Sequence, residues 1–197
     1  AESGVTQFEM MFPINNSTLQ SAFADNADAI AALNSFAKSA ADTTMHITSM
    51  EVVGYASPDG QETKNKALAA ARAKATADYV TSHCKDSKVT TSSHAYLWSD
   101  CIPMVEGMTM DEKDEVLAIL ASKSHSETEK QAELMKMPQV WMIFKNTILP
   151  TMRNSKLTIA YTKDSVVEKS YVVKPPQPAP KPAPQPVAEA KPETKEK

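Results

Sequence analysis

Apolar residues alternate with polar ones in three runs, and between these runs they recur at helical spacing. The runs predict strands at 6–12 (TQFEMMF), 45–56 (MHITSMEVVGYA) and 89–98 (VTTSSHAYLW). Helices are predicted over 19–39 and over the alanine-rich segment that follows Gly60. This β-α-β-α-β order predicts an α+β fold, with a layer of helices on a mixed sheet.

Each predicted helix has an apolar face. The faces consist of Phe23, Ile30, Leu33 and Ala37 in the first helix, and of Leu68, Ala71, Ala75 and Tyr79 in the second. Asp59 precedes the second helix, and Glu62 follows three residues later, which is the spacing of a capping box. We therefore expect Asp59 to cap this helix.

Residues 100–153 interrupt the alternation and predict a helical insert before the last strands. Two capping-box patterns, Thr109-x-x-Glu112 and Ser126-x-x-Glu129, predict helix starts, and Pro138 suits the first turn of a third helix. The apolar positions that follow are Val116, Ile119, Leu120, Leu134, Met135, Val140, Phe144 and Ile148. Strands are then predicted at 156–161 and 165–173, around a TKDS turn.

The segment 174–197 holds eight of the chain's thirteen prolines. Proline fixes φ and lacks an amide donor, so this segment predicts an extended arm at roughly 3.1 Å per residue. We interpret it as a spacer or disordered tail, and the alternative is a ligand for a proline-binding module. The chain thus divides into a domain at 1–173, which includes the insert 100–153, and a tail at 174–197. Its start, Ala-Glu-Ser, fits a mature chain after signal cleavage or a piece of a longer one.

Charge and composition exclude several classes of protein. The net charge is −3, and because the tail carries +2, residues 1–173 carry −5. An acidic body argues against a nucleic-acid partner, which requires a basic face. No apolar run is long enough to predict a membrane-spanning helix. Cys84 and Cys101 are separated by about eleven extended residues at roughly 3.3 Å each, which predicts that they stay unpaired.

The sequence gives no sign of an enzyme, a cofactor or a metal site. GYASPDG lacks the Gly-x-Ser-x-Gly spacing that exposes a nucleophile, and the four histidines are scattered rather than set at metal-ligand spacing. Seven of the eleven methionines fall within 104–152. They are interpreted as core filler for short helices, and the alternative is an adaptable partner surface.

The stretch EVVGYASPDGQETKNKALAAARAK (51–74) resembles the signature of the OmpA-like domain, the peptidoglycan-associating module of Gram-negative envelope proteins. The matching positions are Gly54, Tyr55, Gly60, Asn65, Leu68, Arg72 and Ala73, without gaps. FPINNSTLQSAFADNADAIAALNSFA also resembles the family's first strand end and first helix, so the resemblance covers roughly 7–161. The GYASP(D/E)G form and the helical insert are similar to a branch common in Bacteroidetes.

The resemblance implies recognition of a zwitterion, the free amino-acid end of diaminopimelate. In the family an aspartate in the turn binds the ammonium and an arginine in the second helix binds the carboxylate, for which a guanidinium fork is well shaped. Arg72 matches the arginine, but Ser57 stands where the family has the aspartate, and Asp59 is the nearby carboxylate. A charge-assisted hydrogen bond contributes about 1.5–3 kcal/mol against about 1 for a neutral one, so this exchange weakens binding on the order of tenfold.

The candidate ligand-binding residues are therefore Tyr55, Ser57, Asp59, Gly60, Asn65 and Arg72. Structural alternatives are a salt bridge or a stem over the sheet for Arg72, and a turn-stabilising role for Asn65. The resemblance implies a non-catalytic periplasmic domain, associated with the outer membrane, that binds the peptidoglycan peptide stem. The alternative is an OmpA-like scaffold that has lost wall binding and docks envelope or fimbrial proteins through its insert. A hydrolase is the third and weakest hypothesis.

Overall fold

A computed structural model describes residues 1–42, 44–84 and 88–164 of the protein. Four strands form one mixed sheet in the order β1 (Glu2–Met11), β4 (Asn154–Lys163), β2 (Met45–Ala56) and β3 (Val89–Ala95). β2 and β3 are parallel, and β4 runs antiparallel to both of its neighbours. The predicted α+β class is confirmed. The predicted strand 165–173 and the proline-rich tail 174–197 lie outside the described residues.

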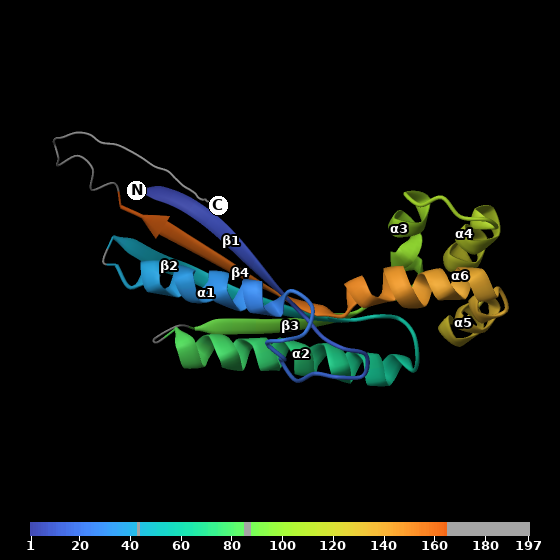
Figure 1. Ribbon diagram of the computed structural model, residues 1–197, viewed down its shortest axis with the longest axis horizontal. Helices are drawn as coiled ribbons and strands as arrows, with labels where there is room; N and C mark the ends of the chain where they lie inside the picture. Colours follow the sequence, from blue (N-terminus) through green and yellow to red (C-terminus); the bar gives the residue numbers. More distant parts are fainter. Residues whose placement is uncertain (43, 85–87, 165–197) are drawn as a thin grey trace, which may run out of the picture.

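Two helices, α1 (Asn26–Ala40) and α2 (Glu62–His83), cover one face of the sheet (Figure 1). Their buried side chains pack with those of β1, β2 and β4 in one apolar core. This core includes Phe8, Met10, Leu33, Met50, Val52, Val80, Leu157 and Ile159. Burial of this apolar surface is what holds the helices against the sheet.

The first helix begins seven residues later than the predicted start at 19, because the chain first makes a loop. Ala24 has φ 50, a left-handed conformation that an α-helix excludes. The buried Asn26 side chain ties the helix start to the end of β1: its Oδ1 accepts from Met11 N at 2.8 Å, and its Nδ2 donates to Met11 O at 2.9 Å. A buried amide at this position was not apparent from the apolar spacing.

The predicted buried face of α2 is wrong by one residue. Leu68, Ala71, Ala75 and Tyr79 are half-buried, whereas Ala69, Arg72, Ala73, Thr76 and Val80 face the interior. The reason is a close approach of the helix to β2 at Gly54, where an added Cβ would lie 2.6 Å from the Ala73 amide nitrogen. Small residues must meet at that contact, so they take the inner face although they are less hydrophobic.

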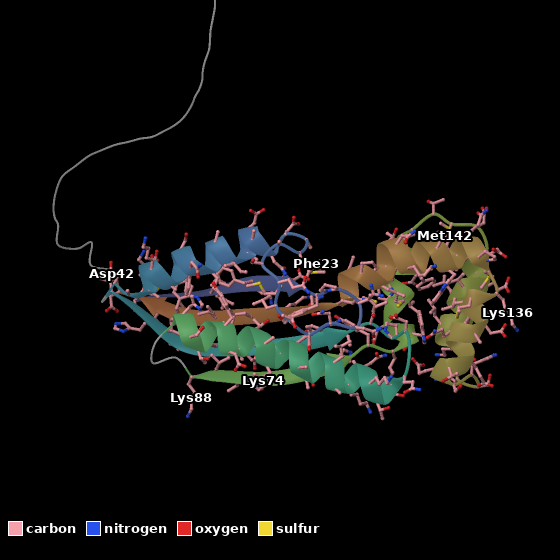
Figure 2. All side chains as sticks on the ribbon, turned by 60° about the horizontal axis from the view of Figure 1, so that its bottom comes forward. Phe23, Asp42, Lys74, Lys88, Lys136 and Met142 are labelled. Atoms are coloured by element: carbon pink, nitrogen blue, oxygen red, sulfur yellow. The ribbon has the colours of Figure 1, made fainter. Side chains whose placement is uncertain are left out.

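A separate helical unit, defined here as residues 98–152, follows β3 and leads into β4. It contains the short helix Trp98–Cys101, α3 (Ile102–Glu106), α4 (Lys113–Ala121), α5 (Glu127–Met135), α6 (Pro138–Ile143), the π-helix Phe144–Ile148 and the 3-10 helix Leu149–Met152. Its own core is built around Trp98, Leu120, Leu134, Phe144 and Ile148. The unit extends from one end of the sheet, with Lys136 and Met142 on its surface (Figures 1 and 2).

The helix starts in this unit agree only partly with the capping-box predictions. The Ser126–Glu129 box is confirmed, since Ser126 Oγ accepts from Glu129 N at 3.1 Å and Glu129 Oε1 accepts from Ser126 N at 2.7 Å. The Thr109–Glu112 box is wrong, because α4 begins at Lys113 and Glu112 itself occupies the cap position with φ 62.

The two cysteines are unpaired, as predicted, and both are buried. Cys84 ends α2, and Cys101 lies in the core of the helical unit, where burial raises the pKa of its thiol to about 12. Among the described residues, no helix is both long and apolar enough to cross a membrane.

Candidate functional site

The turn Ser57–Gly60 connects β2 to α2 and lies at the junction of the sheet and the helical unit. Gly60 has φ +90, a conformation that favours glycine, and a Cβ there would meet no atom within 4 Å. The Gly60 amide donates to Gln131 Oε1 in α5 at 2.9 Å. The turn is thereby anchored to the helical unit.

Asp59 pairs with Arg153, a residue that the sequence analysis did not select. Arg153 Nη2 lies 3.4 Å from Asp59 Oδ2, and Arg153 Nε donates to Ser57 Oγ at 3.1 Å. Ser57 Oγ in turn donates to Asp59 Oδ1 at 2.5 Å. The Asp59 side chain is 19% exposed and that of Arg153 is 10% exposed, so this ion pair is accessible at one edge only.

Asp59 does not cap α2, contrary to the prediction. The cap position is Gln61, and its side chain makes no capping hydrogen bond. Strand pairing explains the change: β4 runs antiparallel to β2 with Gly54 opposite Ser155, which brings Arg153 beside the turn. Asp59 lies two residues before the cap position, and its carboxylate instead accepts from Ser57 Oγ and pairs with Arg153.

Asn65 supports the turn from the first part of α2. Its side chain is 8% exposed, and its Nδ2 donates to the Asp59 main-chain oxygen at 3.0 Å. This contact fits the turn-stabilising role that was the structural alternative for Asn65. Asn65 also lines a cleft, so its side chain borders a solvent-accessible space while it bonds to the turn.

Arg72 is fully buried. Its Nε donates to Asn16 O at 3.0 Å, its Nη1 to Tyr55 O at 2.9 Å and its Nη2 to Pro13 O at 3.1 Å. The guanidinium also lies over the Phe12 ring, 5.5 Å from its centroid. The guanidinium is therefore not placed to bind the carboxylate of a ligand, as the resemblance implies, but joins the loop after β1 to the end of β2.

The Tyr55 side chain projects from the face of the sheet opposite to α2. Gly54, the residue before it, faces α2, and successive strand residues alternate sides. The Tyr55 ring stacks on Tyr96 with centroids 5.2 Å apart, and the Lys156 ammonium lies 5.5 Å from its centroid. The Tyr55 side chain is therefore separated from Asp59 and Arg72, although its main-chain oxygen binds Arg72.

A cleft of about 160 Å³ opens beside the turn. Pro58, Gly60, Glu62 and Asn65 form one wall, and the start of α5 at 126–128 forms another. Of the six predicted site residues, Gly60 and Asn65 line this cleft. Ser57 and Asp59 lie with Arg153, Arg72 is enclosed by carbonyls, and Tyr55 is on the other face. The structure therefore does not gather the predicted residues around one cavity.

Arg153 contacts the carboxylate of Asp59, and the charge of Arg72 interacts with both groups from further away. Burial, and secondarily the positive charge of Arg153, lower the pKa of Arg72 to about 10, while Asp59 acts in the opposite direction. Arg72 is charged at neutral pH, since its pKa is about 10, so two guanidinium groups lie near the single carboxylate of Asp59 at this turn. Such an environment favours an additional anionic group next to Arg153.

Metal chemistry has no candidate centre in the described part of the chain: no three His, Cys, Asp or Glu side chains there are arranged to hold an ion. The charged groups at the turn are the ion pair described above, and the Ser57 hydroxyl is held between Asp59 and Arg153.

No protein-family model and no curated protein matches the sequence. The narrower Bacteroidetes-type assignment therefore stays a prediction. Among solved structures, the chain is similar to the OmpA-like domain of FopA1 from Francisella tularensis subsp. tularensis SCHU S4, with a TM-score of 0.44 and 19% identity, over 83% of this chain and 77% of that chain.

Proposed function

We propose that this chain is a non-catalytic domain of the cell envelope that associates with peptidoglycan in the periplasm. It binds the zwitterionic end of the peptide stem and links the outer membrane or a surface structure to the wall. The motif resemblance around Gly54, Gly60 and Asn65 supports the proposal. The observation that carries it is the partly exposed Asp59–Arg153 pair at the turn.

The chemistry is an exchange of partners. A free amino-acid end presents an ammonium and a carboxylate, and Asp59 and Arg153 present the complementary charges. The ligand's ammonium replaces Arg153 at Asp59, and its carboxylate takes the guanidinium of Arg153. The existing Nη2–Oδ2 distance of 3.4 Å is long for a charge-assisted bond, so the intramolecular pair gives up little when it opens.

Arg72 acts behind this pair rather than on the ligand. Its three carbonyl bonds fix the loop after β1 and the end of β2, and its charge leaves Arg153 with an unmatched positive environment. The negative charge of the ligand's carboxylate would balance this excess of positive charge. The arginine role in this proposal therefore belongs to Arg153.

The proposal predicts that Asp59→Asn and Arg153→Gln each weaken retention on purified peptidoglycan at low salt, on the order of tenfold. The measurement is co-sedimentation with insoluble wall fragments. Free diaminopimelate is expected to compete, whereas cadaverine, which has the same amines without the carboxylates, is expected to compete poorly.

Asp78→Asn is the matched control, because Asp78 is exposed and pairs with Lys74 on the same helix. Circular dichroism of each variant separates lost binding from lost folding. Retention that is unchanged in both Asp59→Asn and Arg153→Gln would rule out the zwitterion site while leaving weaker wall contacts to be mapped.

Ser57→Asp is expected to strengthen retention. Ser57 Oγ already lies within hydrogen-bond distance of both Asp59 and Arg153, so a carboxylate there would stand beside that of Asp59. Two carboxylates would attract the ligand's ammonium more strongly than one, and the ligand's carboxylate would still take the guanidinium of Arg153. The measurement is the same sedimentation assay, and weaker retention than wild type would count against the exchange.

A second candidate function is an OmpA-like scaffold that has lost wall binding and docks envelope or fimbrial proteins through its helical unit. One observation favours it: Asp59 and Arg72 both have intramolecular partners. If the wild-type chain shows no retention on wall fragments at any salt concentration, this second function replaces the first.

A further inference from the structure

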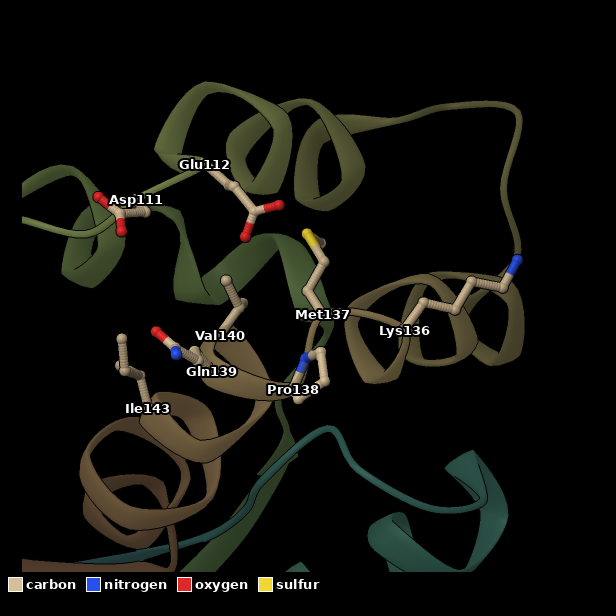
Figure 3. Close-up of a pocket in the computed structure, with 8 residues that line it drawn as sticks. All are labelled: Asp111, Glu112, Lys136, Met137, Pro138, Gln139, Val140 and Ile143. Carbon is tan, nitrogen blue, oxygen red and sulfur yellow. The ribbon is translucent and has the colours of Figure 1, made fainter.

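A second pocket, of about 200 Å³, lies in the helical unit at the end of the molecule away from the sheet (Figures 1 and 3). Its apolar side is formed by Met137, Pro138, Val140 and Ile143 from the start of α6. Asp111 and Glu112, which precede α4, stand on the opposite side, and Figure 3 shows the Glu112 carboxylate directed over Val140 and Met137. The pocket thus combines an apolar floor with an acidic rim.

The rim carries a local excess of negative charge. Residues 106–115 contain five acidic residues and one lysine. Lys136 also borders the pocket, but its ammonium points away in Figure 3 and pairs with Glu133 at 2.9 Å. Within residues 1–42, 44–84 and 88–164, neither Asp111 nor Glu112 makes an ion pair. A cationic partner can therefore reach both carboxylates without displacing an existing bond.

Two methionine side chains of the same unit are solvent-exposed: Met142 in α6 is 56% exposed and Met135 in α5 is 50% exposed. Flexible thioether side chains adapt to the shape of an incoming chain. The methionine-rich segment is therefore only partly core filler, and the pocket itself is lined by Met137.

We propose that the occupant of this pocket is the segment 174–186 from a second copy of this chain. That segment contains seven prolines, Lys174 and Lys181, and no acidic residue. Proline rings supply apolar surface for the floor, and lysine supplies the positive charge for Asp111 and Glu112. A proline-rich segment also loses little conformational freedom on binding, because its φ angles are already restricted.

We assign the segment in the pocket to a second copy because of the position at which the described part of the chain ends. Asp164 is held at the start of β2, where its amide donates to Thr44 O at 2.8 Å. That end of the sheet is opposite the helical unit in Figure 1. A contact between the tail of one copy and the pocket of the next is heterologous, so it builds open chains or closed rings rather than isologous dimers.

The test is sedimentation velocity of the full chain over a concentration series. We expect association that weakens as NaCl is raised, because exposed charges are screened. Asp111→Lys with Glu112→Lys, and separately Lys174→Glu with Lys181→Glu, are each expected to weaken association by about tenfold or more. An equimolar mixture of these two variants is expected to associate again, since one retains the native pocket and the other the native tail.

Glu2→Lys with Glu51→Lys is the matched control, because both residues are exposed on the sheet and Glu2 pairs with Lys163, at the end of β4 away from the helical unit. A labelled synthetic peptide of residues 174–187 provides a direct probe, and its fluorescence anisotropy should saturate on the wild-type chain but not on the pocket variant. A chain that stays monomeric and shows no saturable peptide binding overturns the proposal. This outcome is independent of wall retention, which concerns the opposite end of the helical unit.

Discussion

Arg72→Ala is expected to lower the free energy of unfolding by about 3 kcal/mol or more, because it removes a fully buried guanidinium that donates to three partly buried main-chain carbonyls. Each unsatisfied buried acceptor costs about 1–3 kcal/mol. Alanine is the best helix former, so the loss cannot be attributed to α2 itself. The lost contacts are those between α2, the loop after β1 and the last residues of β2.

Urea unfolding followed by circular dichroism measures this effect. Lys74→Ala is the matched control, since Lys74 lies two residues further along the same helix with its side chain 77% exposed, and its loss should change stability by less than about 0.5 kcal/mol. A loss below about 1 kcal/mol in Arg72→Ala would contradict the structural role assigned to the guanidinium.

The pH dependence of this contribution has a definite sign. The folded-state pKa of Arg72 is about 10, below the value of the unfolded chain. The unfolded state therefore binds more protons above pH 10, and stability arising from this group rises with pH only in that range. Near neutral pH the group is charged in both states, so the difference between wild type and Arg72→Ala should not vary between pH 6 and 8.

Gly54→Ala is expected to be the second severe change. A Cβ at this position would overlap the Ala69 main-chain oxygen and would lie 2.6 Å from the Ala73 amide nitrogen. These are backbone atoms of α2, which cannot rotate away, so the helix must move off the sheet. Overpacking of this kind costs about 1–3 kcal/mol and occasionally more; we expect the upper end because the contact spans a helical turn.

Gly107→Ala provides the comparison. Gly107 has φ −84, and a Cβ there would approach no atom closer than 3.7 Å. It should therefore be neutral or stabilising, by up to about 1 kcal/mol through the unfolded state. If the two glycine variants show equal midpoints in urea, the close helix–sheet contact at Gly54 is not important for stability.

These two positions change how the motif is understood. Gly54 and Arg72 were selected because they match a ligand-binding signature, yet in the structure one permits close packing and the other satisfies carbonyls. A variant at Arg72 that loses wall retention would therefore report folding as much as binding. Asp59 and Arg153 are the positions at which binding can be tested with less disturbance of the core.

The sequence by itself determined the alternation of strands and helices, the helical insert before the last strand, the Ser126–Glu129 cap and the free cysteines. These features depend on the periodicity and spacing of residues that are close together in the sequence. Only the tertiary structure decided three further features: the direction of the Arg72 side chain, the residues on the inner face of α2, and the partner of Asp59. The pairing of β4 with β2 brings Arg153, which is 94 residues away in the sequence, to Asp59. Local patterns do not predict such a contact. The partner of a charged side chain depends on which distant segments the fold brings beside it.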